Sequence, residues 1–144
     1  MTTILTPHIT YEEMIASQTA TRMGIDNTPD ELIYANLVET AHLLEAIRSI
    51  LGNRPILISS GYRSPEVNRV IGGARNSSHM TGKAADFTCP GYGNPRDVCY
   101  AISQSGIVFD QLIHEFNSWV HIAWDQNMRQ QVLTIDNYGT RLGL

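Results

Sequence analysis

Hydrophobic residues recur at helical spacing through the first third of the chain, in the pattern of a helix that buries one face. Thr28, Pro29 and Glu31 match a helix start, with threonine as cap, proline at the first helical position and glutamate closing a capping box. Gly52 is typical of a helix end. We therefore expect a helix over 28–51, with a buried face formed by Leu32, Ile33, Leu37, Val38, Leu44, Ile47 and Ile50.

Three shorter helices are indicated by capping residues rather than by long periodic patterns. Residues 17–27 between the first two helices contain turn-forming residues and predict an irregular connection. The helix starts are Thr10 with Glu13, Ser64 with Pro65, and Asn94 with Pro95, and the last two helices are expected to end at Gly72–Gly73 and Gly106.

The second half of the chain contains short runs rich in β-branched and aromatic residues, which predict strands. A tight turn at Asn117 and Ser118 is expected to join two of them as a hairpin. Helices come first and strands follow, so we predict an α+β fold with N-terminal helices packed on a mainly antiparallel sheet. The predicted strands are 55–60, 83–89, 109–116, 119–124 and 131–136.

Length and charge narrow the possible functions. The 144 residues suit a single domain, in which we expect 1–27 to form an N-terminal cap segment and 28–144 the core, and the chain to be a monomer. The formal net charge is −4 and the ten lysines and arginines are dispersed. Nucleic-acid binding requires a basic face, so we expect no nucleic-acid partner.

Two cysteines, Cys89 and Cys99, are too few for a disulfide scaffold. They are expected to be two buried thiols, although a single disulfide stays open at this point. The N-terminus lacks the basic and apolar regions of a secretory signal, and no apolar run is long enough to span a bilayer. We expect synthesis in the cytoplasm without membrane insertion, so that action outside the membrane would require a separate route of release.

The stretch SSHMTGKAAD, residues 77–86, carries the first candidate chemistry. A catalytic zinc ion takes three protein ligands and keeps one position free. His79 and Asp86 offer two ligands, and His121 in the apolar strand WVHIAW offers a third. Taken singly, each residue also fits a structural role, because a histidine in a strand is often only hydrogen bonded and an aspartate often caps a turn.

Three stretches together resemble the zinc D-Ala-D-Ala carboxypeptidase family, which is of the LAS type. SSHMTGKAAD resembles its S-x-H-x-x-G-x-A-x-D signature, and EFNSWVHIAW resembles its Trp-x-His strand. SSGYRSPEVN resembles the segment in which an arginine precedes the first zinc histidine. The resemblance extends over nearly the whole chain. It implies the family's zinc peptidase/hedgehog-like fold and favours its compact branch of phage endolysins.

The resemblance implies that His79, Asp86 and His121 hold one Zn²⁺ ion, and that Arg63 grips a peptide carboxylate or the scissile carbonyl oxygen. A guanidinium suits that role because of its two-donor fork. A surface ion pair is the alternative for Arg63. The implied activity is hydrolysis of amide bonds in peptidoglycan stem or cross-link peptides containing D-amino acids, as in a phage or prophage endolysin. Bacterial peptidoglycan is then the partner.

The general base is where this chain departs from the family. Some members place a histidine two residues before the last ligand, and others a carboxylate three residues before it; here those positions are Trp119 and Ser118. We expect Glu115 to be the base, because zinc peptidases usually use a carboxylate to move the proton of the attacking water. Asp110 and Asp125 are less favoured.

The length of the hairpin loop decides between Glu115 and His114. A three-residue loop is expected to place Glu115 opposite His121 and on its face, whereas a two-residue loop is expected to place His114 there. A different class of function also stays open: a non-catalytic, zinc-stabilised module that binds cell wall or serves as a phage structural part. A metal-free α+β domain is the third possibility.

Overall fold

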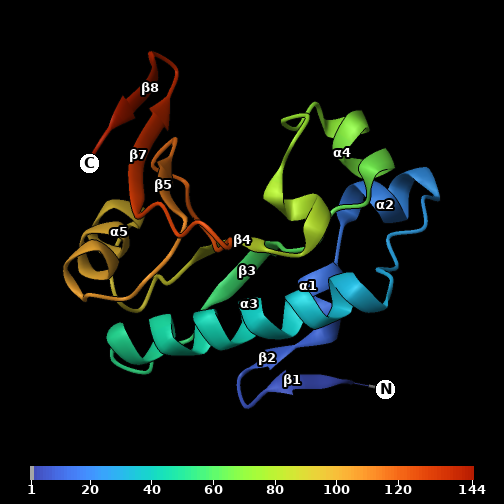
Figure 1. Ribbon diagram of the computed structural model, residues 1–144, viewed down its shortest axis with the longest axis horizontal. Coiled ribbons are helices and arrows are strands. Elements are labelled where there is room, and N and C mark those ends of the chain that lie inside the picture. Colours follow the sequence, from blue (N-terminus) through green and yellow to red (C-terminus); the bar gives the residue numbers. More distant parts are fainter. Residues whose placement is uncertain (1) are drawn as a thin grey trace.

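Figure 1 shows a long helix lying along one side of the molecule, with a sheet beside it and two short helices, close to the N-terminus in sequence, that precede the long helix. The computed structural model describes residues 2–144. The helices are α1 (Tyr11–Ile15), α2 (Gln18–Met23), α3 (Glu31–Ile50), α4 (Pro65–Ile71) and α5 (Pro95–Gln104), with a 3-10 turn η1 (Ser78–Thr81). The strands are β1 (Ile4–Thr6), β2 (Ile9–Thr10), β3 (Leu57–Ser60), β4 (Ala84–Thr88), β5 (Gln111–Glu115), β6 (Trp119–Ala123), β7 (Gln131–Asp136) and β8 (Gly139–Leu142).

Six strands form the main sheet in the order β3-β4-β6-β5-β7-β8. All neighbours are antiparallel except β5 and β7, which are parallel. The predicted α+β fold with a mainly antiparallel sheet is confirmed. Strand β8 was not predicted, because its residues are all exposed and carry no apolar alternation.

The core lies between the helices and one face of this sheet. Helices α3 and α5 contribute apolar side chains that pack with alternate residues of β4, β5 and β6. From β4 and β6 these are Ala85, Phe87, Val120 and Ile122. Since successive residues of a strand point to opposite faces, the residues between them point away from the core. That second face of β4 and β6 carries the chemistry described below.

The predicted helix over 28–51 forms as α3, but its cap differs. Asp30, not Thr28, is the N-cap, and its side chain accepts a hydrogen bond from the backbone N–H of Ile33. The predicted buried face is largely right, with the exception of Leu32, which is 72% exposed. The helix begins two residues later than predicted, so Leu32 lies in its first, solvent-facing turn.

The prediction of an irregular connection over 17–27 is wrong. Residues Gln18–Met23 form α2, which Ser17 caps and Gly24 ends in the left-handed conformation. The helix is short and has few apolar residues, so it lacks the periodicity that identifies longer helices. It packs against α4, and this contact shapes the cavity described below.

The hairpin between β5 and β6 has a three-residue loop, Phe116–Ser118, rather than the predicted turn at Asn117 and Ser118. Glu115 pairs with Trp119, so the strand ends before Phe116. Phe116 and Asn117 both have positive φ, at 54° and 49°. A loop of this length sets which side chains share the face of β6, and therefore which carboxylate lies near its histidine.

Two smaller predictions can be compared with the structure. Cys89 and Cys99 are buried and unpaired, which confirms two buried thiols rather than a disulfide. Among the helices of residues 2–144, none is both long enough and apolar enough to cross a membrane.

Candidate metal centre

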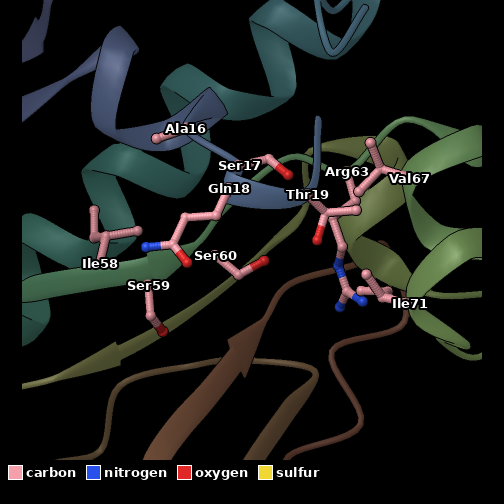
Figure 2. A pocket seen from close by; sticks show the side chains of 10 residues that line it. All are labelled: Ala16, Ser17, Gln18, Thr19, Ile58, Ser59, Ser60, Arg63, Val67 and Ile71. Carbon is pink, nitrogen blue, oxygen red and sulfur yellow. The ribbon is translucent and has the colours of Figure 1, made fainter. Parts of the chain in front are cut away.

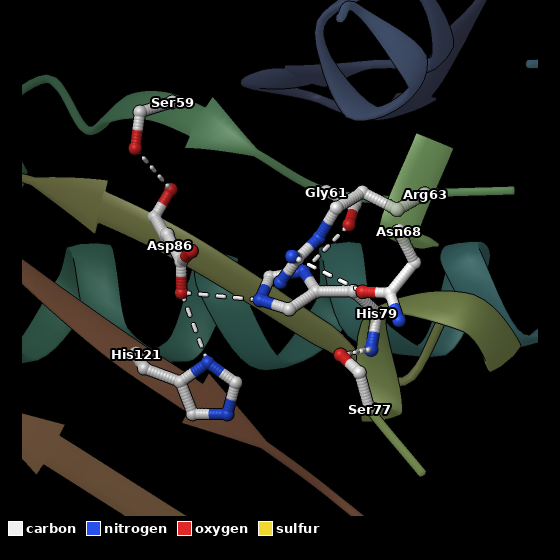
Figure 3. A network of polar contacts seen from close by, with 8 residues as sticks. All are labelled: Ser59, Gly61, Arg63, Asn68, Ser77, His79, Asp86 and His121. Carbon is white, nitrogen blue, oxygen red and sulfur yellow. Dashed lines mark hydrogen bonds and ion pairs between the residues drawn. The ribbon is translucent and has the colours of Figure 1, made fainter. Parts of the chain in front are cut away.

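The three predicted ligands come together although they belong to different elements. His79 lies in η1, Asp86 in β4 and His121 in β6, and their ligand atoms all lie within 4.8 Å of one another. His121 Nδ1 is 2.9 Å and His79 Nε2 is 3.2 Å from the same oxygen, Asp86 Oδ1 (Figure 3). Two ring nitrogens and a carboxylate therefore point at a common space.

The backbone explains how these side chains meet. Asp86 and His121 are direct partners in the antiparallel pair β4–β6, so both project from the face opposite the core. His79 reaches them because Gly82 ends η1 with φ 76° and turns the chain into β4. A side chain at Gly82 would begin 3.0 Å from the backbone oxygen of Ile33, so only glycine allows the turn to lie this close to α3.

The ring of His79 is held in one orientation. Its Nδ1 lies 2.7 Å from the carbonyl oxygen of Gly61, and the residue is 1% exposed. A ring N–H that donates to a carbonyl leaves the other nitrogen with its lone pair, and metal-binding histidines usually have such a partner. Nε2 of His79 is therefore the atom available for a cation, and it is the one that faces Asp86.

The charge states also suit a divalent cation. Burial lowers the pKa of His79, which favours the neutral ring that can act as a ligand. Burial alone would raise the pKa of Asp86, but its close contacts with the rings of His121 and His79 outweigh burial and hold that pKa well below its usual range. Two imidazoles and one carboxylate form a donor set that fits zinc in an open catalytic site.

Arg63 lies beside this centre on the segment that follows β3. Its backbone N–H donates to the carbonyl oxygen of His79 at 3.1 Å, and its Nη1 donates to Asn68 Oδ1 at 3.3 Å. Burial lowers the pKa of Arg63. The negative charges of Asp86 and Glu115 partly offset this lowering, because both carboxylates stabilise the charged guanidinium. Arg63 forms no salt bridge within residues 2–144, so the alternative of a surface ion pair is not seen.

Glu115 shares the face of His121 but is not directly opposite it. Ile113 pairs with His121, and Glu115 pairs with Trp119 at the end of the hairpin. The predicted placement of Glu115 directly opposite His121 is therefore wrong. Glu115 lies two residues beyond Ile113, the residue that pairs with His121, and so shares its face at the next position along the strand. Burial raises the pKa of Glu115, and the negative charge of Asp86 raises it further.

The other candidate bases lie elsewhere. His114 pairs with Val120 on the core side of the sheet, and its Nε2 is hydrogen bonded to Asn117 at 3.0 Å. Asp110 accepts hydrogen bonds from Nε and Nη2 of Arg129, at 2.9 and 2.8 Å, so its carboxylate is engaged in that ion pair. Glu115 thus stays the predicted base, with geometry that favours it over His114.

Comparison with known proteins shows which protein family the chain matches. A model of the family described as peptidase M15 matches residues 7–123, which include the three candidate ligands, Arg63 and Glu115. The chain belongs to the peptidase M15 family. The zinc D-Ala-D-Ala carboxypeptidase of Streptomyces albus G is 45% identical over 53 residues, which are 37% of this chain and 21% of that protein. The match thus spans about a fifth of the curated relative's length.

Membership of a peptidase family confirms the resemblance found in the sequence, together with its fold. The His79–Asp86–His121 cluster is consistent with a single zinc ion in an M15 metallopeptidase.

Asn27 is a residue of this M15 site that sequence reasoning missed. Its side chain is buried, and Nδ2 donates to the carbonyl oxygens of Ile15 at 2.8 Å and Tyr62 at 3.1 Å. Its Oδ1 accepts from the backbone N–H of Ser64 at 2.7 Å. These bonds hold the peptide groups on both sides of Arg63. The sequence shows only an asparagine near a proline, which is typical of any turn.

Replacing Asn27 by alanine is expected to lower the free energy of unfolding by about 2–4 kcal/mol, because one backbone N–H and two carbonyls lose a partner in a buried place. Urea unfolding followed by circular dichroism measures this. The exposed Asn127→Ala is the matched control and is expected to change stability by less than about 0.5 kcal/mol. A loss below about 1 kcal/mol for Asn27→Ala would show that water replaces its hydrogen bonds.

A cavity of about 510 Å³ is lined by Arg63 together with residues of α2, β3 and α4 (Figure 2). The start of α2 and strand β3 form opposite walls, and Arg63 stands at one end. Arg63 therefore lines the cavity and, through its backbone N–H, also contacts the carbonyl oxygen of His79.

Proposed function

We propose that the protein hydrolyses amide bonds in peptidoglycan stem or cross-link peptides that contain D-amino acids. The observation that carries this proposal is the convergence of His79, Asp86 and His121 on one space, with Glu115 on the same face of the sheet and Arg63 bonded to His79 through its backbone N–H. The name of the Streptomyces relative, a zinc D-Ala-D-Ala carboxypeptidase, supports the class of substrate.

Each candidate residue has a separate role in the proposed hydrolysis. A zinc ion held by His79, Asp86 and His121 would supply Lewis acidity, which would polarise the scissile carbonyl and lower the pKa of a bound water towards neutrality. The Glu115 carboxylate takes a proton from the attacking water and returns it to the nitrogen of the leaving amine. The Arg63 fork binds negative charge on the substrate, either a terminal carboxylate or the oxygen of the scissile carbonyl as charge develops there.

The environment of Glu115 supports this role. A general base works best when its pKa lies near the working pH, and burial together with the charge of Asp86 moves the pKa of Glu115 upward, in that direction. His114 has no comparable access, because it faces the core side of the sheet.

The wider biological setting is part of the same proposal. A phage or prophage lysin of this kind is synthesised in the cytoplasm, is released by a separate agent, and then acts as a monomer on the cell wall. In this account residues 1–144 form one catalytic domain, in which the cap segment 1–27 packs on the core and takes part in the site through Asn27.

Mass spectrometry of digested wall fragments tests the proposal. The zinc-loaded protein is incubated with purified sacculi and with a synthetic stem pentapeptide ending in D-Ala-D-Ala. Release of D-alanine identifies a carboxypeptidase, and conversion of cross-linked dimers to monomers identifies an endopeptidase. A sample stripped of metal with a chelator is the control. Binding to sacculi without any new peptide end would instead support the non-catalytic module.

A further inference from the structure

Two residues of the cavity lining are also partners of candidate metal ligands: the backbone N–H of Arg63 donates to His79, and Ser60 pairs with Asp86. Strand β3 is an edge of the six-stranded sheet, and its free side forms one wall of the cavity. Ser60, at the end of that strand, lines the cavity and pairs with Asp86 across β3–β4. A peptide paired with the free edge of β3 would lie two strand spacings, about 10 Å, from β4 and its Asp86, with β3 between them.

The opposite wall, residues 16–19, is fixed in place by buried contacts. The backbone N–H of Tyr62 donates to the carbonyl oxygen of Met14 at 2.7 Å, which ties the Arg63 segment to the end of α1. A side chain at Gly61 would begin 2.2 Å from that same oxygen, so a glycine is required for this approach. Asn27 adds bonds to Ile15 and to both sides of Arg63. The cavity is thus built into the fold, which reduces the cost of ordering a ligand.

The lining has a distinctive chemistry. Its apolar part comes from Ile58, Val67 and Ile71, and its polar part consists of small hydroxyls and the amide of Gln18. Arg63 is the only charged side chain among the described residues of the lining, and no carboxylate is present there. Such a surface suits peptide groups and methyl-sized side chains. It offers no partner to an ammonium group, which would lose hydration without compensation.

We propose that this cavity binds one arm of the substrate peptide next to the scissile bond, and that residues 16–19 select small, uncharged side chains on that arm. This inference rests on the proposed peptidase function. The volume of about 510 Å³ lies within the range of about 300–1,000 Å³ typical of ligand sites. The free edge of β3 supplies the backbone groups with which an extended peptide pairs, and the pockets beside it give specificity.

The test fills the cavity without touching the metal centre. Thr19→Trp places an indole in it from α2, whereas Thr21→Trp makes the same change on a part of α2 that does not line this cavity. With the D-Ala-D-Ala pentapeptide, kcat/KM is expected to fall at least about tenfold for Thr19→Trp and to stay within about twofold for Thr21→Trp. Equal kcat/KM for the two variants would overturn the proposal. If Thr19→Trp does not fold, Gln18→Trp at the exposed start of the helix replaces it.

Binding is measured separately from turnover. The pentapeptide is added to zinc-loaded Glu115→Gln protein, and amide chemical shifts are followed by NMR. Changes at residues 17–19 and 58–60 support the proposal, and changes that spare these residues, or no changes at all, overturn it. If the wild type cleaves no wall peptide, the proposed function fails, while the shift map still decides whether the cavity binds peptide.

A separate variant tests whether residues 16–19 select the side chains of the substrate. A pentapeptide with D-lysine in place of either terminal D-alanine is expected to be a poorer substrate for the wild type. Thr19→Asp adds a carboxylate to the wall and is expected to improve the use of the D-lysine peptide relative to the D-alanine peptide about tenfold. An unchanged ratio for both peptides would contradict selection by residues 16–19.

Discussion

Replacing Asp86 by alanine is expected to remove zinc binding and to lower the hydrolysis of stem peptides by more than about 1,000-fold, since losing a member of a catalytic unit commonly costs about 10⁴–10⁶ in kcat. Asp86 supplies the only carboxylate of the cluster, and both histidine rings are within 3.2 Å of its Oδ1. Without it, only two imidazoles of the cluster face the site, with no negative charge among them to offset a divalent cation. Zinc per chain, measured after dialysis against metal-free buffer, is expected to approach zero.

Asp136→Ala is the matched control for this experiment. Asp136 is another sheet aspartate, but its carboxylate pairs with Arg141 on the β7–β8 hairpin, away from the metal centre. That variant is expected to keep its zinc and its activity, because an exposed ion pair contributes little to stability. Stoichiometric zinc together with wild-type turnover in Asp86→Ala would contradict the assignment of the cluster.

The metal ligands were predictable because their signal is local. The spacing of His79 and Asp86 within one stretch, and a histidine inside an otherwise apolar strand, are both visible in a linear chain. Their meeting follows from strand pairing, which places Asp86 opposite His121. In the structure, apolar residues alternate along β4 and β6, so one face packs on the helices and the other carries the ligands.

Competing local signals explain the error at the start of α3. Thr28 and Asp30 are both good cap residues, and Pro29 between them fits the first position of a helix. In the structure the backbone N–H of Thr28 donates to Asp26 Oδ1 in a local turn, and Asp30 caps the helix instead. Both arrangements satisfy backbone donors locally, so packing of the helix on the core decides between them.

The hairpin register depends on contacts that a linear reading does not show. Phe116 adopts positive φ, which the sequence does not indicate, because a bulky residue rarely takes that conformation. Its ring packs on Trp119 with centroids 5.7 Å apart, so tertiary packing helps to hold the loop. Asn27 was missed for a related reason: its partners lie 12, 35 and 37 residues away.

Glu115→Gln is expected to lower kcat by about 10²–10⁴-fold, the contribution of a general base, while zinc content and stability stay close to those of the wild type. Glutamine keeps the size of the side chain but accepts no proton at neutral pH. Because Glu115 pairs with Trp119 and is not one of the clustered ligand atoms, its loss should leave the cation in place. Stem-peptide hydrolysis, zinc analysis and thermal unfolding are measured on the same preparation.

His114→Gln is the variant that separates the two candidate bases. His114 lies on the core side of the sheet with its Nε2 bonded to Asn117, and glutamine offers that asparagine a replacement donor. Its kcat is therefore expected to stay within a few fold of the wild type. If His114→Gln lost turnover while Glu115→Gln kept it, the base would have to act from the opposite face, and the hairpin register that places Glu115 on the metal side would be wrong. The two variants thus test the register and the chemistry together. A shift of one residue in the pairing of β5 would move Glu115 to the core face and His114 to the metal face.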